Sequence, residues 1–145
     1  MKLLLIGALA ALPFCGAHAG VSIESACYQS ESSHGAAGKA SAFFRFKSYR
    51  DDDAQKYIGG IVNYKNSKSS IPVVYDDEVQ AGEGSSGSFQ RTWLEIINRK
   101  IVGQYVEYGG HDGNSGGRYI KYTGFKDNRI VVFRVVMNDA PCSGD

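Results

Sequence analysis

Long hydrophobic segments are missing from this chain of 145 residues except at its start, where an apolar run from Leu3 to Phe14 follows Lys2. That run is shorter than the roughly 20 residues that a membrane-spanning helix needs, so we expect no membrane span. A basic start, a short apolar stretch and the small residues of Ala17-His18-Ala19 are typical of a secretory signal peptide. We therefore predict that residues 1–19 are removed and that residues 20–145 form a single domain, periplasmic or secreted.

An excess of charge of one sign is also missing. Removing 19 of the 145 residues leaves 126, with 15 basic and 15 acidic side chains, because Lys2 is the one charged residue lost. A chain without net charge has no broad field that would draw nucleic acid or anionic lipid to it. We therefore expect no nucleic-acid partner.

Cysteine is scarce, and its positions suit export. The first of three cysteines, Cys15, follows Phe14, whereas lipoprotein processing needs a small residue there, so we expect no lipid anchor. Cys27 and Cys142 remain, and an even number of cysteines in an exported protein indicates a disulfide. This bond would enclose almost the whole domain and stabilise it by about 4–5 kcal/mol in the chain-entropy model.

Helical periodicity is missing as well. Alternation of apolar and polar residues, rich in β-branched and aromatic types, predicts strands over residues 21–28, 40–49, 56–64, 71–75, 89–97, 101–108, 118–125 and 130–137. Within the third of these, Gly59-Gly60 predicts a bulge or a sharp bend. We predict an all-β fold, an antiparallel meander of about seven to eight strands. Closure removes exposed strand edges, so we expect a closed or partly closed barrel, with a β-sandwich as the alternative.

Residue sets that carry catalytic or metal chemistry are poorly represented. The mature chain has only two histidines, far apart, and the acidic triplets at 51–53 and 76–78 would alternate between faces of a strand. We therefore expect solvated turns there and no metal site. Glu95 and Glu107 flank a hairpin and could form a carboxylate pair for glycosidic chemistry. On opposite strands of a surface hairpin we expect them to be solvated, and we predict that the chain is not an enzyme.

The segment before the seventh predicted strand is rich in Gly and Ser. Residues Gly109–Gly117 lack the Lys and the following helix of a phosphate-binding loop, so we expect no cofactor. The segment closes with Ser115-Gly116-Gly117-Arg118-Tyr119, which resembles the inhibitory loop of periplasmic lysozyme inhibitors, with a second Gly and with Arg in place of Lys. Those proteins are small exported β-barrels that carry disulfides. The resemblance implies a loop whose basic side chain and hydroxyl enter the carboxylate-lined cleft of an enzyme.

Tyrosine is abundant around the same hairpin, and it is a favoured anchor of protein–protein contacts because it buries a large area at low entropic cost. We predict a non-catalytic binding protein of the cell envelope that inhibits or neutralises another protein, such as a lysozyme, a protease or a toxin. The predicted partner-binding residues are Tyr108, His111, Ser115, Arg118 and Tyr119.

Two other functions stay open at this stage. A lipocalin-like carrier of a small apolar ligand would use Phe44, Phe46 and Phe133 as walls of an interior cavity. Gly103-Gln104-Tyr105 is similar to hairpins of biotin-binding barrels, but those need several Trp residues and this chain has only Trp93. A structural or assembly subunit of the envelope would form homo-oligomers.

Overall fold

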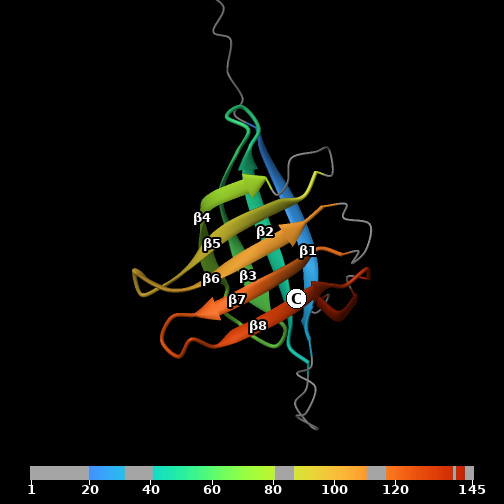
Figure 1. The fold of residues 1–145 in the computed structure, drawn as a ribbon, viewed down its shortest axis with the longest axis vertical. Helices are drawn as coiled ribbons and strands as arrows, with labels where there is room; N and C mark the ends of the chain where they lie inside the picture. The colour runs from blue at the N-terminus through green and yellow to red at the C-terminus, as the bar shows by residue number, and fades with distance from the viewer. Residues whose placement is uncertain (1–19, 32–40, 81–86, 111–116, 139, 143–145) are drawn as a thin grey trace, which may run out of the picture.

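The computed structural model describes residues 20–31, 41–80, 87–110, 117–138 and 140–142, which form an antiparallel barrel of eight strands (Figure 1). The strands are β1 (Val21–Ser30), β2 (Phe43–Asp51), β3 (Lys56–Tyr64), β4 (Ile71–Gln80), β5 (Phe89–Ile97), β6 (Lys100–Gly109), β7 (Tyr119–Gly124) and β8 (Ile130–Val135). Each strand pairs with the next in the chain, and β8 returns to β1. The predicted all-β meander is confirmed as a closed barrel, so the sandwich alternative does not apply.

Two elements differ from the predicted pattern. β4 continues to Gln80, because its second half pairs with β5 beyond an irregularity between Tyr75 and Asp77. After Val135 the chain leaves the sheet and forms a short 3-10 helix, η1 (Ala140–Cys142). No helix in the described part of the chain has the length and hydropathy of a membrane-crossing segment.

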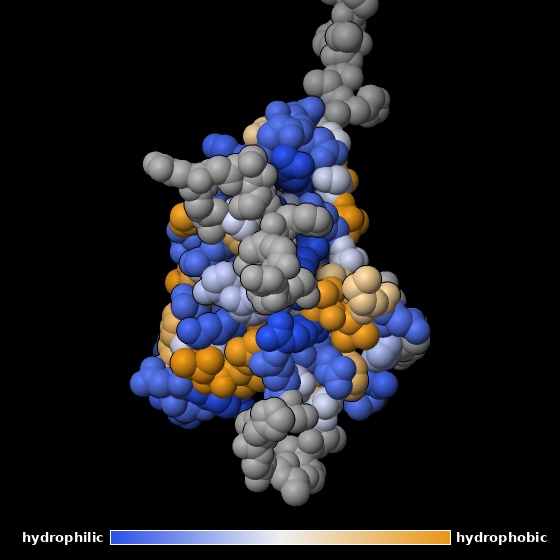
Figure 2. All heavy atoms as spheres, turned by 45° about the vertical axis from the view of Figure 1, so that its right-hand side comes forward, coloured by the Kyte–Doolittle hydropathy of each residue, from blue (hydrophilic) through white to orange (hydrophobic). Residues whose placement is uncertain are grey.

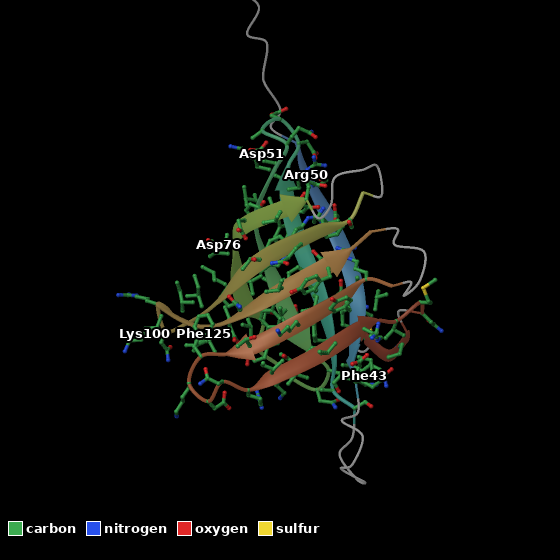
Figure 3. The ribbon with its side chains drawn as sticks, in the orientation of Figure 1. Phe43, Arg50, Asp51, Asp76, Lys100 and Phe125 are labelled. Carbon is green, nitrogen blue, oxygen red and sulfur yellow. A yellow bond between two sulfur atoms is a disulfide. The ribbon has the colours of Figure 1, made fainter. Side chains whose placement is uncertain are left out.

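Turn chemistry fixes the register of the β5–β6 hairpin. Asn98 and Arg99 connect the two strands with φ values of 52° and 63°. Two consecutive residues with positive φ match a type I′ turn, whose twist suits antiparallel strands. At this end of the barrel, Phe125 donates its N–H to the carbonyl of Val102 at 2.9 Å, and Figure 3 shows Phe125 close to Lys100.

The predicted irregularity at Gly59-Gly60 is a bulge between β2 and β3. Tyr49 pairs with Gly59 and Arg50 pairs with Tyr57. The residue between these two positions on β3, Ile58, therefore has no paired residue on β2. A Cβ on Gly60 would lie 2.5 Å from the carbonyl oxygen of Lys47, so the two backbones approach closely at this point. Glycine is required here because any larger residue would push β2 and β3 apart.

Two neighbouring strand pairs of the barrel share only short ladders, and we call these two places seams. β1 and β8 share three residue pairs, between Tyr28–Ser30 and Phe133–Val135, and β3 and β4 also share three, between Gly60–Val62 and Ile71–Val73. These short ladders leave parts of the joined strands with one edge unpaired among the described residues.

The predicted disulfide is confirmed, and it reinforces the β1–β8 seam. Cys27 lies on β1 with its side chain on the outer face, between Ala26 and Tyr28, which face the core. Its partner Cys142 comes from η1, with the two Cα atoms 5.9 Å apart. Beside it, Val136 donates its N–H to the carbonyl of Cys27 at 2.8 Å. The disulfide therefore links the segment after β8 to β1 and reinforces one of the two short ladders.

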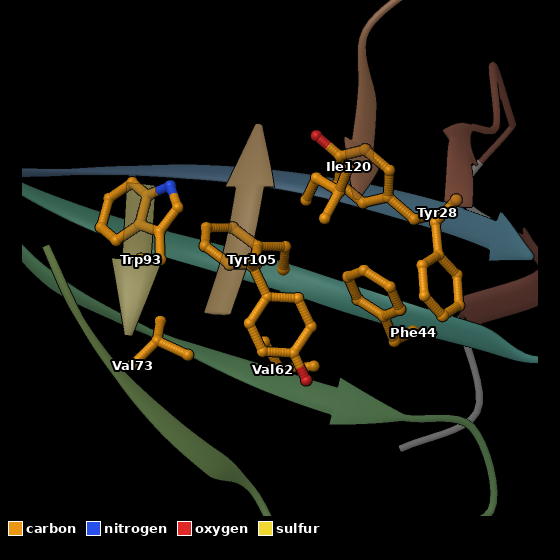
Figure 4. Close-up of a cluster of buried hydrophobic side chains, with 9 residues drawn as sticks. Tyr28, Phe44, Val62, Val73, Trp93, Tyr105 and Ile120 are labelled. Atoms are coloured by element: carbon orange, nitrogen blue, oxygen red, sulfur yellow. The ribbon is translucent and has the colours of Figure 1, made fainter. Parts of the chain in front are cut away.

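Nine buried side chains fill the middle of the barrel, and we call them the aromatic core. They are Tyr28, Phe44, Phe46, Val62, Val73, Trp93, Tyr105, Ile120 and Phe133 (Figure 4). Edge-on ring contacts dominate, such as Phe44 with Phe133 at 4.7 Å and Phe46 with Trp93 at 5.2 Å between centroids. Such edge-to-face pairs are more favourable than their buried area alone suggests.

A candidate binding site at the loop end of the barrel

The end of the barrel from which segments 81–86 and 111–116 leave is called the loop end here. β6 and β7 reach this end with Tyr108 paired to Tyr119, both on the outer face and half-buried. Their rings stack with centroids 4.6 Å apart and an interplanar angle of 11°. The guanidinium of Arg134 lies 5.8 Å from the Tyr119 centroid, and its Nε donates to Glu31. The hairpin thus presents a stiff aromatic surface just before the loop.

Inside the loop end lie five charged side chains, which we call the ion-pair cluster: Glu24, Glu78, Arg91, Glu107 and Arg118. Glu107 is 1% exposed and accepts hydrogen bonds at Oε1 from Arg118 Nε and, at 3.2 Å, from the Tyr28 hydroxyl. Arg118 Nη2 also lies 3.6 Å from Glu24 Oε2. Burial of a charge is costly unless it is paired, and these contacts supply the pairing.

Arg91 connects its own strand, β5, to four other strands at the loop end. Its Nε donates to Glu78 Oε2 at 2.5 Å, and its Nη1 lies 3.7 Å from Glu107 Oε2 and 3.9 Å from Glu24 Oε2. The guanidinium also lies 4.5 Å from the centroid of Tyr57, whose hydroxyl donates to Glu24 Oε1 at 2.7 Å. This arrangement joins β1 and β3 to β4, β5 and β6 where the backbone ladder at the seams is short.

The ionisation of the cluster follows from burial and pairing. Burial lowers the pKa of Arg91 and Arg118, but the hydrogen bonds and attraction of their acidic partners, led by Glu78 for Arg91, outweigh it, so both pKa values rise. Burial, strengthened by the hydrogen bond to Glu24, raises the pKa of Tyr57 to about 12. Burial and the charge of Glu107 raise the pKa of Tyr28 as well. Both arginines stay cationic and both tyrosines stay neutral near pH 7.

The predicted binding residues divide between the two faces of this hairpin. Tyr108 and Tyr119 are brought together on the outside, whereas Arg118 turns inward and is ion-paired with Glu107 and Glu24. His111 and Ser115 lie outside the described residues. Arg118 therefore faces the buried carboxylates and not the outer face of the hairpin.

The expectation of a solvated carboxylate pair on a surface hairpin is wrong. Glu95 and Glu107 both face the interior, with exposures of 4% and 1%. Glu95 accepts a hydrogen bond from the Tyr122 hydroxyl at 2.7 Å, toward the end opposite the loop end. Four strand positions separate the two residues in the pairing of β5 with β6, a backbone distance of about 13 Å at the usual rise.

The two acidic triplets have structural roles. Asp51 Oδ1 accepts the N–H groups of Asp53 and Ala54 at 2.9 Å each, which caps the β2–β3 turn as expected. The second triplet, residues 76–78, is not a turn but part of β4, because it pairs with β5. Its Glu78 faces inward to Arg91. Within the described residues, no group of three potential metal ligands gathers.

Sequence reasoning missed Arg91, Glu24 and Glu78 as members of a site. A signal was present, since alternation places Arg91 and Glu95 on the same face of β5 as Trp93. The same argument places Glu24 on the face of Tyr28 in β1. A charged residue in phase with the core is an indicator of a buried ion pair.

Comparison of the chain with protein-family models, with curated proteins and with solved structures found no significant match.

Proposed function

We propose that this chain is an exported, non-catalytic binding protein of the cell envelope that inhibits or neutralises another protein. The single observation that carries the proposal is the stacked pair Tyr108–Tyr119 on the outer face of the β6–β7 hairpin, directly before the loop. Preorganised tyrosines lose little side-chain entropy when a partner covers them, which makes them effective anchors.

The ion-pair cluster supports this proposal from inside the barrel. Arg118 begins the return from the loop, and its bonds to Glu107 and Glu24 hold that position. A loop whose base is fixed spends less free energy on ordering when it binds. We therefore assign direct contact to Tyr108, Tyr119 and the loop residues His111 and Ser115, and a positioning role to Arg118.

A carrier of a small apolar ligand is a weaker candidate. The three phenylalanines that would form its walls, Phe44, Phe46 and Phe133, pack against other side chains of the aromatic core. The hollow of about 420 Å³ formed by Gln29–Glu31 and Arg134–Met137 opens on the outside of the β1–β8 seam.

The test is inhibition by the purified, processed protein of representative lysozymes, scored by clearing of a bacterial cell-wall suspension, and of secreted proteases, scored on a peptide substrate. We expect one enzyme class to be inhibited. The double variant Tyr108→Ala/Tyr119→Ala should weaken inhibition by about 100-fold, since two anchor residues are lost. Phe43→Ala is the matched control, an outer-face aromatic residue of β2 near Lys65, and it should leave inhibition unchanged.

Arg118→Ala separates contact from positioning. If Arg118 positions the loop, the variant should lose inhibition because a less ordered loop associates more slowly and dissociates faster, and Glu107→Gln should share the defect. Equal inhibition by the wild type and the double tyrosine variant, or no binding to any enzyme of either class, would contradict the proposal.

A further inference from the structure

Among the residues that the structure describes, β1 has an unpaired edge over residues 21–26. On its other side β1 pairs with β2 along its full length, but its ladder with β8 begins only at Tyr28 among the described residues. The carbonyl of Cys27 points to the β8 side, where it accepts from Val136, and the carbonyl of Gly20 points to the β2 side, where it accepts from Asp52. Because these directions alternate along a strand, the N–H and C=O groups of Val21, Ile23 and Ser25 point to the free edge.

Two other unpaired strand edges in the described barrel are protected against strand addition. The β1 edge is not protected in this way. On β4, the part beyond Val73 carries an irregularity at residues 75–77 and three acidic side chains. On β3, the part before Gly60 carries the bulge at Ile58. Bulges and edge charges are the devices by which proteins prevent strand addition. β1 is regular over residues 21–26, and its single charge, Glu24, turns inward to Tyr57 and Arg118.

The side chains along this edge favour contact with another apolar strand. Val21 and Ile23 face outward and are 53% and 61% exposed. Figure 2 brings the side of the barrel that carries β1 forward and shows hydrophobic patches between hydrophilic residues. Apolar residues at alternate positions of an open edge are the pattern that strand addition uses.

We propose that a second copy of this chain occupies the β1 edge, with the two β1 strands antiparallel across a two-fold axis at Ile23. In this register Ile23 pairs with Ile23 of the second copy, and Val21 pairs with Ser25. These are the residues whose backbone groups face the edge, so every one of those groups gains a partner. A two-fold interface of this kind is self-complementary and closed.

Charge on the outer face fits this register. Lys47 lies beside Ser25 and Asp51 lies beside Val21 in the β1–β2 ladder. The two-fold axis places Lys47 of one copy at the level of Asp51 of the other, at both ends of the joined strands. Three strand spacings, about 14 Å, separate these charges, so they attract each other only weakly. The processed chain also carries equal numbers of basic and acidic residues, so no net repulsion opposes association. The contact is a single strand pair, which favours a weak, reversible dimer.

The experiment is sedimentation velocity of the processed protein from low micromolar to several hundred micromolar, together with amide hydrogen exchange at both limits. We expect a monomer–dimer equilibrium. The amides of Val21, Ile23 and Ser25 should gain protection with concentration, whereas those of Ser22 and Glu24, bonded to β2, should be protected throughout.

Two substitutions at the axis test the geometry. Ile23→Lys places like charges opposite each other and should weaken dimerisation by at least about tenfold. Ile23→Pro removes an N–H that points to the free edge, so it should abolish the dimer while leaving the β1–β2 ladder intact. Ile130→Lys is the matched control, since Ile130 is 57% exposed on β8, and it should dimerise like the wild type. Circular dichroism checks that each variant folds.

Three results would overturn the proposal. One is a monomer at every concentration, and another is a dimer that both Ile23 variants form as well as the wild type. The third is protection of the three edge amides only when a target enzyme is added, because the edge would then belong to that partner and not to a second copy.

Discussion

The aromatic core and the ion-pair cluster occupy the same inner face of the barrel, yet they are stabilised by opposite kinds of interaction. On β5 and β6, Trp93 pairs with Tyr105 in the core, and two positions toward the loop end Arg91 pairs with Glu107 in the cluster. The core gains stability because apolar surface leaves water. The cluster contains charges whose burial is unfavourable and whose partners compensate for it.

This difference means that the core gives the barrel its stability, whereas the cluster gives the loop end a defined shape. A core residue can be replaced by another of similar volume at modest cost. A member of the cluster cannot lose its charge alone, because its partner is then left buried and unpaired. The three predictions below test this contrast, from the largest expected effect to the smallest.

Trp93→Ala should lower the free energy of unfolding by about 4 kcal/mol, because it removes a fully buried ring that contacts Phe46, Tyr57 and Tyr75. Denaturant titration followed by circular dichroism measures the change. The control Val74→Ala, on the exposed face of β4, should cost less than about 1 kcal/mol. A loss of similar size in both variants would mean that the barrel interior is not the main source of stability.

Glu107→Gln should lower the free energy of unfolding by about 2–3 kcal/mol, because Arg91 and Arg118 would lose the carboxylate that they share. Glu31→Gln is the control, since Glu31 pairs with Arg134 at the exposed surface, and it should cost less than about 1 kcal/mol. An equal loss of unfolding free energy in Glu107→Gln and Glu31→Gln would mean that the buried cluster is no more important for stability than an ordinary surface ion pair.

Tyr57→Phe should cost about 1 kcal/mol at neutral pH through loss of the hydrogen bond to Glu24. The pKa of Tyr57 is raised to about 12 in the folded protein, so the folded state favours the neutral phenol. The stabilisation that the folded state gains from the neutral Tyr57 phenol is complete below the pKa of about 10 that Tyr57 has in the unfolded chain. It is lost as the pH rises toward about 12. Partial exposure of Tyr57 limits it to about 1 kcal/mol.

The measurement for Tyr57 is the free energy of unfolding of wild type and variant at pH values between about 8 and 12. The difference in the free energy of unfolding between wild type and Tyr57→Phe, called the gap here, should become smaller as the pH rises. Val74→Ala, which removes no ionisable group from the exposed face of β4, serves as the control with a constant gap. A constant gap for Tyr57→Phe as well would show that its hydrogen bond to Glu24 does not couple to alkaline stability.

The sequence predicted much of the fold but little of the candidate site. Alternation located the strands, and the scarcity of cysteine left one possible pairing in the processed chain, between Cys27 and Cys142, which the structure contains. The bulge at Gly59-Gly60 also followed from local chemistry. In the site, Tyr108 and Tyr119 lie together on the outer face, whereas Arg118 turns inward.

The sequence by itself determined which residues share a face of each strand, because that depends only on the period of two along an extended backbone. Tertiary structure alone decided that the face of Arg91 and Glu107 is the inner one and that each of them meets an oppositely charged partner there. Their partners come from β1, from β4 and from Arg118 just before β7, and only closure of the barrel brings these segments within reach. The same closure, ending short of residues 21–26, left the β1 edge open.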